Sequence, residues 1–283
     1  GTELAKHKGF IIKAPKFGHA QNVYICDKST NIIYKGLGSI KSMQSIAADI
    51  MIEIDNHNPT NFLDILSLCE EIKVDGKRIN SKSLDILCEI GFFSEYGNVE
   101  AIERIRYFYN KYGKCKTIKK ETLKPMEIDI IRSHAEKETE KQFSKLDNMG
   151  IIHDILNALN PTEDNIQQLI CNQIKHLGYV DVSDYNMPID EYVVQDAHTD
   201  KWNRVWLSLY HLASNQSHEY KCSPKWFEKN QCTSGDLIRV AFTTREKSKL
   251  VGEREDGKKI FQKTGEYENI VECYEILEKM VFE

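Results

Sequence analysis

Two glycines and two lysines stand close together early in the chain, in the segment Tyr-Lys-Gly-Leu-Gly-Ser-Ile-Lys-Ser. The glycines allow a tight turn with positive φ, and the serine after them suits the N-cap of a helix that opens there. Free N–H groups at such a helix start, with lysines beside them, bind phosphate well. The alternative is a glycine-rich loop that only joins a strand to a helix. The predicted phosphate contacts are Lys35, Gly36, Gly38, Ser39 and Lys41.

A lysine-rich segment at 111–124 holds six lysines and one acidic residue. Such a stretch suits contact with a nucleic-acid backbone, and each phosphate contact makes binding more sensitive to salt. A solvated linker face is the alternative explanation. The predicted backbone contacts in this segment are Lys114, Lys116, Lys119 and Lys120.

Aromatic residues alternate with aliphatic ones over 204–210, which is typical of a strand with one buried face. If Val205, Leu207 and Leu209 fill a core, the other face presents aromatic side chains on which bases can stack. The acidic balance of residues 179–283, with 14 basic and 19 acidic side chains, predicts only weak single-strand binding, or a packing or spacer role. The predicted stacking residues are Trp202, Trp206 and Tyr210. Three lysines, Lys258, Lys259 and Lys263, partly offset the acidity.

Residues for catalysis or metal binding are not apparent. Acidic residues at 181–184 and 190–191 fit solvated turns, and no Asp-x-Asp pair lies in a strand beside a nucleotide loop. The eight cysteines lack zinc-ligand spacing, which predicts reduced thiols and a cytoplasmic protein. We therefore expect no catalytic residue, metal or cofactor in this chain. No apolar run of about 20 residues and no signal peptide is present, so no membrane partner is expected.

Three segments must position these residues. Residues 1–35 predict a helix remnant closed by a glycine, a strand that runs into a proline and glycine turn over 10–19, and a short hairpin over 22–34. From 39 to 178 the apolar period is helical, with Asn61 and Asn80 as N-caps and Pro125 at a helix start. Glycines are expected to end or break helices at Gly91, Gly97, Gly113, Gly150 and Gly178. The chain starts without methionine, and we expect it to be part of a longer protein.

After Gly178 the pattern changes to strands. Strands are expected at 191–195, 204–211, 218–222, 235–242 and 274–277, with a helix at 224–229 and a polar loop over about 245–269. Three strands, a helix and two strands is the order of an OB-fold. We therefore predict an α+β protein with units at 1–115, 116–178 and 179–283, the middle one a helical connector.

Four blocks occur in a specific order: GFIIKAPKFGHA, NIIYKGLGSIKS, NFLDILSL and INSKSLDILCEIGFFSEYGN. This order resembles the distal fingers of the bacterial or phage DNA polymerase III α subunit, a C-family replicative polymerase. The resemblance implies a tandem helix-hairpin-helix over residues 1–113, in which Asn80, Ser81 and Lys82 also contact the DNA backbone. It then implies a connector with a sliding-clamp contact and an OB domain. Ser42-Met43-Gln44 stands where the family has Gly-Val-Gly, a departure that affects the second turn of the hairpin.

The resemblance implies a function in DNA replication. The chain would be a non-catalytic, DNA-binding fragment that grips the duplex of a primer-template, with the OB domain near the single-stranded template. The parent would be a DNA-directed DNA polymerase, a nucleotidyltransferase using Mg²⁺, whose palm active site this chain lacks, so the chain alone should be inactive. Residues 140–146 faintly resemble a clamp-binding peptide, although a helix with Phe143 and Leu146 facing its own core is the alternative. Another class is a stand-alone phage accessory protein that binds nucleic acid or a replisome partner, and a third is an unrelated helical module with an OB-like domain.

Overall fold

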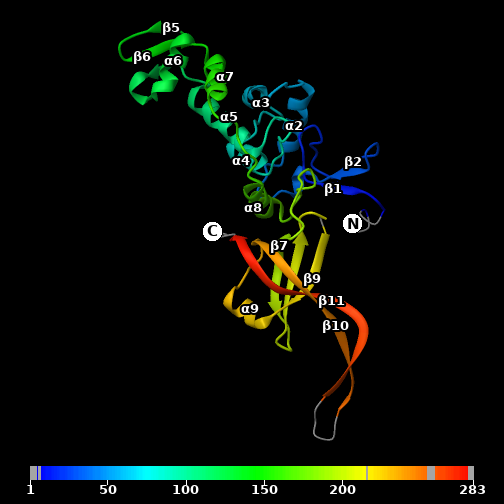
Figure 1. The fold of residues 1–283 in the computed structure, drawn as a ribbon. Coiled ribbons are helices and arrows are strands. Elements are labelled where there is room, and N and C mark those ends of the chain that lie inside the picture. The colour runs from blue at the N-terminus through cyan, green and yellow to red at the C-terminus, as the bar shows by residue number, and fades with distance from the viewer. Residues whose placement is uncertain (1–4, 6–7, 215, 254–258, 280–283) are drawn as a thin grey trace. The chain divides into compact units, whose positions relative to one another are not determined.

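The computed structural model describes residues 5, 8–214, 216–253 and 259–279. The chain divides into two compact units, residues 1–179 and residues 180–283, each with its own hydrophobic core. The ranges 1–115 and 116–178 from the sequence both lie in the first unit. Figure 1 shows the elements of each unit.

The first unit begins with a small sheet of three short strands, β1 (Ile11–Lys13), β2 (Ile25–Asp27) and β3 (Ile32–Tyr34). The order is β1-β3-β2, with β3 parallel to β1 and antiparallel to β2. The predicted strand within 10–19 and the hairpin over 22–34 are therefore confirmed. A single turn of 3₁₀ helix, η1 (Leu37–Ser39), follows directly.

Amphipathic helices build most of the first core. They are α2 (Ala47–Asn56), α3 (Phe62–Glu71), α4 (Ser81–Glu89), α5 (Val99–Tyr112) and α8 (Ile166–Leu177). The side chains of Asn61 and Asn80 accept N–H groups in the first turns of α3 and α4, as predicted. Gly178 ends α8 in the left-handed conformation, with φ of 71°, which is the expected stop.

A second small sheet with two helices occupies residues 117–158. It contains β4 (Thr117–Lys119), the 3₁₀ turn η2 (Lys120–Thr122), α6 (Pro125–Ser133), β5 (Ala135–Glu138), β6 (Gln142–Leu146) and α7 (Asn148–Ala158), with strand order β4-β6-β5. The helix start at Pro125 is confirmed.

Two expectations for this segment are wrong. Residues 142–146 form strand β6 and not a helix, because Phe143 fills the core from the centre of the sheet and is fully buried. Gly150 does not break a helix, since it lies in the first turn of α7, where its N–H donates to the Asp147 cap. A Cβ at this position would lie 2.5 Å from the His134 ring, so glycine is required by packing and not by backbone conformation.

The second unit is a closed barrel of five strands. These are β7 (Glu191–Thr199), β8 (Val205–His211), β9 (Gln216–Cys222), β10 (Leu237–Glu253) and β11 (Lys259–Glu278), with α9 (Pro224–Lys229) between β9 and β10. Around the barrel the order is β10-β11-β9-β8-β7, and β7 pairs with β10 to close it. Val205, Leu207 and Leu209 are buried in its core, as the alternation predicted.

The predicted polar loop over 245–269 is wrong. β10 and β11 stay paired far beyond the barrel, from Thr243 opposite Ile270 to Glu253 opposite Lys259. We call residues 243–253 with 259–269 the ribbon, and Figure 1 shows it leaving the barrel as a twisted pair of strands. Both faces of the ribbon are largely exposed, so the sequence carries no alternation between buried and exposed positions there. Lys258 lies outside the described residues.

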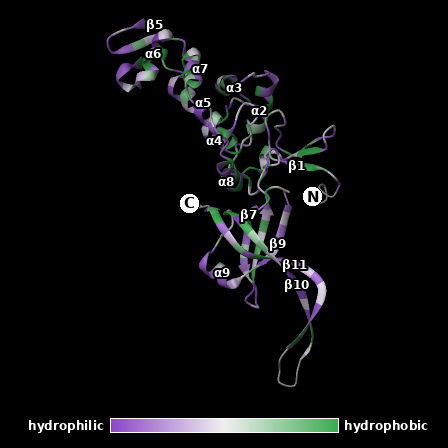
Figure 2. Cartoon of the chain, in the orientation of Figure 1, coloured by the Kyte–Doolittle hydropathy of each residue, from purple (hydrophilic) through white to green (hydrophobic). Residues whose placement is uncertain are grey.

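Figure 2 shows hydrophobic residues concentrated on the inner sides of the helices and of the barrel strands. Within the described part of the chain, no helix has the length and apolar character needed to cross a membrane.

Candidate nucleic-acid interface

The glycine turn of the first unit differs from its predicted form. Gly36 has φ of −78°, and neither glycine of the turn has positive φ. No α-helix opens at Ser39, since α2 begins only at Ala47, and the Ser39 hydroxyl donates to the Gly36 carbonyl at 2.7 Å. The glycines are needed for close approach: a Cβ at Gly36 would lie 2.3 Å from the Asn22 carbonyl oxygen, and one at Gly38 would lie 2.7 Å from it.

The same packing occupies the backbone amides of the turn. Leu37 and Gly38 donate to the carbonyls of Gln21 and Asn22, at 2.7 and 3.1 Å. The amide of Lys41 donates to the carbonyl of His176 at 3.2 Å. These N–H groups therefore do not form an open cradle for a phosphate, and phosphate contact in this turn depends on side chains.

Gln44 joins the two predicted backbone-contacting segments. Its backbone N–H donates to the Ser83 hydroxyl at 3.0 Å, and its side-chain amide donates to the Arg78 carbonyl at 3.2 Å and accepts the Asn80 N–H at 2.9 Å. Ser42 reaches this arrangement with φ of 65°, a conformation that favours glycine. The turn after Lys41 therefore packs on the start of α4, and no sequence pattern predicted this role of Gln44.

Among the side chains predicted to contact the DNA backbone in the glycine turn and at the start of α4, some are exposed and others contact neighbouring side chains. Lys41 and Lys82 are exposed. The ammonium group of Lys35 instead lies 3.1 Å from the ring centroid of Tyr179, a close cation–π contact. The Ser81 hydroxyl is near the guanidinium of Arg106, at 3.3 Å.

The lysine-rich segment is largely neutralised by acidic partners. Lys114 pairs with Glu70 at 2.7 Å, Lys119 with Glu121 at 3.8 Å, and Lys120 with Glu138. Lys116 is exposed. Exposed ion pairs contribute little to stability and can exchange partners, but the segment is not the uncompensated basic strip that its composition suggested.

The β7–β8 turn of the barrel presents a large aromatic surface between two cations. Trp202 is 64% exposed at the tip of the turn. The Lys201 ammonium lies 4.3 Å from its ring centroid, and the Arg204 guanidinium carbon lies 4.6 Å from it. An indole flanked by two cations can stack on a base while the cations meet the neighbouring phosphates.

Asp200 holds this turn in shape. One carboxylate oxygen accepts the N–H groups of Trp202 and Arg204, at 2.9 and 3.0 Å. The other accepts Nε of Arg204 at 2.7 Å and the indole N–H of Trp206 at 3.2 Å. Burial alone would raise the pKa of Asp200, but these donors outweigh it and hold the pKa far below its ordinary value. The sequence analysis missed Asp200 and Arg204.

The surface continues along β8 and β9. Trp206 lies directly opposite Lys221 of β9, whose ammonium is 5.5 Å from the ring centroid of the indole. The Arg204 guanidinium carbon lies 5.8 Å from the centroid of the same ring. Tyr210 does not belong to this open surface, because its hydroxyl donates to the Val180 carbonyl at 3.1 Å and burial raises its pKa. We call Lys201, Trp202, Arg204, Trp206 and Lys221 the aromatic-cation row.

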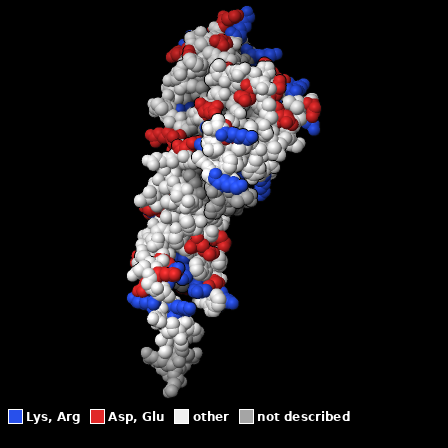
Figure 3. Space-filling model, turned by 90° about the vertical axis from the view of Figure 1, so that its right-hand side faces the viewer, with Lys and Arg blue, Asp and Glu red and all other residues white. Residues whose placement is uncertain are grey.

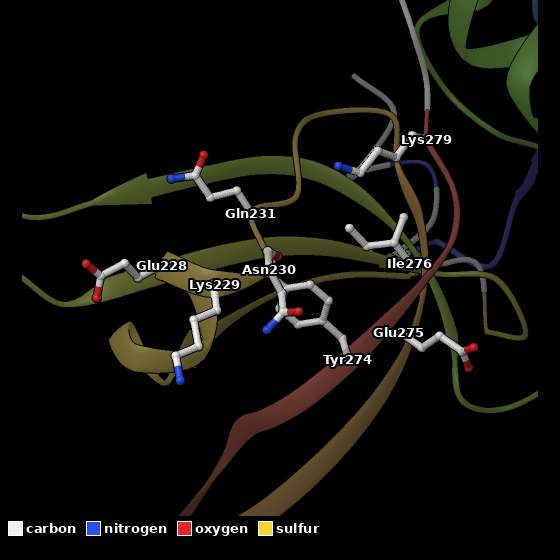
Figure 4. Close-up of a pocket in the computed structure, with 8 residues that line it drawn as sticks. All are labelled: Glu228, Lys229, Asn230, Gln231, Tyr274, Glu275, Ile276 and Lys279. Carbon is white, nitrogen blue, oxygen red and sulfur yellow. Dashed lines mark hydrogen bonds between the residues drawn. The ribbon is translucent and has the colours of Figure 1, made fainter.

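A pocket of about 720 Å³ lies elsewhere on the barrel, between the end of α9 and β11 (Figure 4). Tyr274 crosses it and donates its hydroxyl hydrogen to the Asn230 carbonyl, and Glu228, Lys229, Glu275 and Lys279 line its rim. Burial raises the pKa of Tyr274, so the phenol stays protonated. Among the described residues no group of three or more His, Cys, Asp or Glu side chains is arranged to hold a metal ion.

Figure 3 shows basic and acidic side chains interspersed over one face of the molecule, without a continuous basic strip on that face. A scan against protein-family models gives no match to this chain, and a search of curated proteins finds no matching sequence.

Proposed function

We propose that this chain is a non-catalytic, DNA-binding part of a C-family replicative polymerase, and that its barrel binds single-stranded nucleic acid through the aromatic-cation row. The observation that carries the proposal is the exposed Trp202 ring with Lys201 and Arg204 close to it, in a turn whose backbone amides the Asp200 carboxylate binds. Such a site suits any base, because every base has a face to stack, and it needs few phosphate contacts.

The connectivity of the barrel supports an OB-fold. Three antiparallel strands, a helix and two further strands follow one another, the first strand pairs with the fourth, and the third is parallel to the fifth. OB-folds bind oligonucleotides on the face of their second and third strands and on the loops at one end. Here Trp206 and Lys221 lie on that face, and Trp202 lies in the loop between the first two strands.

The first unit would contact duplex backbone through Lys41 and Lys82, beside the turn that Gln44 joins to α4. Support comes from the order of the sequence blocks, which resembles the distal fingers of the DNA polymerase III α subunit. The occupied amides of residues 37–41 argue for contacts through side chains, so this grip would be weaker than that of an open hairpin. Polymerisation by the parent, its use of Mg²⁺ and a sliding-clamp contact remain part of this proposal.

The test is fluorescence anisotropy with labelled single-stranded DNA, duplex and primer-template over a salt series. Trp202→Ala should weaken single-strand binding by about 1–3 kcal/mol, or roughly 5- to 160-fold, which is the usual value of one stacked base. Tyr107→Ala on α5 removes an equally exposed aromatic ring from the first unit and should leave single-strand binding unchanged.

Salt dependence separates the two sites. Each phosphate contact on a single strand adds about −0.7 to the slope of log K against log salt, so loss of Arg204 should flatten the single-strand slope by about that amount. Lys41→Ala with Lys82→Ala should weaken duplex binding only. Equal single-strand affinity for Trp202→Ala and the unchanged protein would refute the barrel site.

A further inference from the structure

Three helices of the first unit, α4, α5 and α8 (Figure 1), border a polar groove. The groove consists of two adjoining cavities of about 480 and 290 Å³, and the side chains of Glu89 and Glu103 line both of them. The amide side chains of Gln168 and Asn172 line the larger cavity, and Tyr107 lines the smaller one. None of these residues is a predicted DNA contact, so the proposed function makes no use of the groove.

The walls of the groove are fixed by contacts between α4 and α8. Asn172 on α8 is buried, and its side-chain amide donates to the Glu89 carbonyl at the end of α4, at 3.1 Å. Gln168 donates to the side-chain oxygen of Asn172 at 3.0 Å. A Cβ at Gly91, just after α4, would lie 3.1 Å from Leu169 of α8, so the two segments pack closely. The groove is therefore formed in advance, and a ligand need not order its walls.

Most acidic side chains along the groove already have a partner with a basic side chain. The pairs are Asp85 with Arg106, Glu89 with His176 at 2.6 Å, and Glu100 with Arg104 at 2.8 Å. Glu103 is the exception, since no side chain or amide among the described residues forms a hydrogen bond or ion pair with its carboxylate. Partial burial, and then the charge of Glu89, raise the pKa of Glu103 above its ordinary value. The groove therefore contains one carboxylate that lacks a paired cation.

The nearest cation on the same helix does not fill this role. Arg106 also lines the smaller cavity, but its guanidinium is bound by Asp85 and donates to the Ser81 hydroxyl at 3.3 Å. Its charge lowers the pKa of Glu103 less than burial raises it. A cation that pairs with Glu103 must therefore come from outside the groove.

Tyr107 offers an aromatic surface beside this carboxylate. It lies four residues after Glu103 on α5, and residues at this spacing share one face of a helix with Cβ atoms about 5–6 Å apart. The Tyr107 side chain is 59% exposed. A planar cation can thus pair with the carboxylate and stack on the ring at the same time.

We propose that this groove is a docking site for an arginine-containing segment of a partner protein, in which a guanidinium group pairs with Glu103 and stacks on Tyr107. Charge complementarity decides the kind of partner, because an unpaired carboxylate attracts a cation and repels the phosphates of nucleic acid. Arginine fits better than lysine, since its planar guanidinium can donate to both carboxylate oxygens and stack on a ring. The site uses no residue of the aromatic-cation row and goes beyond the proposed function.

The test is an NMR titration of the isotope-labelled full chain with a peptide of alternating arginine and alanine residues. Two matched peptides carry lysine or citrulline in place of arginine, and citrulline keeps the shape of the side chain but has no charge. Signals from residues of α4, α5 and α8 should shift with the arginine peptide. The lysine peptide should bind about two- to five-fold more weakly, and the citrulline peptide should not bind.

Variants locate the binding at the groove. Glu103→Gln should weaken binding of the arginine peptide by about five-fold or more, because it removes a charge-assisted pair. Glu71→Gln at the end of α3 makes the same charge change, lines neither cavity and should have no effect. Tyr107→Leu should weaken binding by about two- to five-fold, whereas Tyr107→Phe keeps the ring and should bind normally. All four variants should keep the circular dichroism spectrum and the single-strand affinity of the unchanged protein.

Several results would overturn the docking site. Equal affinity of the arginine peptide for Glu103→Gln and the unchanged protein would do so, and so would an equal loss in Glu103→Gln and Glu71→Gln, which would show only general charge attraction. Glu103→Lys should abolish binding of the arginine peptide, and retained binding would contradict the pairing. If free arginine or spermidine binds the groove as tightly as the peptide, the occupant is a small cation and not a protein segment. Lost single-strand binding in Trp202→Ala concerns the barrel alone.

Discussion

Asp200 shows how one carboxylate can organise a tight turn. It accepts hydrogen bonds from the backbone amides of Trp202 and Arg204, the Arg204 guanidinium and the Trp206 indole, and so fixes the backbone from which the Trp202 ring projects. A ring fixed in advance loses less conformational freedom on binding than a mobile one. The aromatic residues were predicted from the sequence, whereas Asp200, which shapes their turn, was missed.

The depressed pKa of Asp200 predicts how this turn responds to acid. In the unfolded chain the group has a pKa near 3.9, and in the folded chain the pKa is lower, so the carboxylate stabilises the fold above pH 4. That stabilisation declines as the pH falls below 4 through the folded pKa. The difference in free energy of unfolding between the unchanged protein and Asp200→Asn should therefore be constant from pH 7 to 5 and shrink towards pH 3. Urea unfolding followed by tryptophan fluorescence measures it, and a difference that is the same at every pH would contradict the assignment.

The site residues show what a sequence can and cannot reveal. Trp206 was predictable because strand alternation separates inner from outer positions over 205–209, and Trp202 because it lies in the turn next to that strand. Tyr210 was wrongly predicted to be exposed for stacking. The residue that binds its hydroxyl, Val180, is distant from it in the sequence, so strand alternation could not show this contact. Asp200 had a usable signal, since aspartate often opens a tight turn by accepting amides two residues later. Lys221 lies beside Trp206 because of the register between β8 and β9, and this register could not be predicted from the sequence.

At the scale of elements, helix ends were predicted correctly where a single residue type sets the backbone conformation or caps the helix. Asn80 capping α4, Pro125 opening α6 and Gly178 closing α8 each follow from a backbone requirement of one residue type. The predictions were wrong where the structure depends on contacts between segments that are distant in the sequence. Strand β6 is short and the ribbon buries neither face, so neither has a diagnostic period. The glycines at 36 and 38 serve a close contact and not a left-handed turn.

That close contact gives a prediction for the glycine turn. Gly36→Ala keeps an allowed φ but places a methyl group 2.3 Å from the Asn22 carbonyl oxygen, so the backbone must shift. We expect a loss of about 1–3 kcal/mol in the stability of the first unit, the usual cost of overpacking. Lys41→Ala in the same turn should change stability by less than about 0.5 kcal/mol. Thermal unfolding followed by circular dichroism compares the two variants, and equal midpoints would show that the turn relaxes freely.

For the molecule as a whole, the net charge of −5 conceals local surfaces of opposite character. Nucleic-acid affinity would come from a few placed cations beside aromatic rings, and not from a general positive field. Binding that depends mainly on stacking should keep much of its strength at moderate salt. This is the opposite of what a uniformly basic protein would show.

The two hydrophobic cores predict two separable unfolding transitions. All three tryptophans, Trp202, Trp206 and Trp226, belong to the second unit, whereas most of the helix belongs to the first. Tryptophan fluorescence therefore reports mainly on the barrel, and helical circular dichroism mainly on the first unit. Leu207→Ala opens a cavity in the barrel core, where the side chain is fully buried, and should cost about 2–5 kcal/mol in the fluorescence transition only. Ile65→Ala on α3 should lower the dichroism transition only, and a joint shift of both signals in either variant would mean that the units unfold as one.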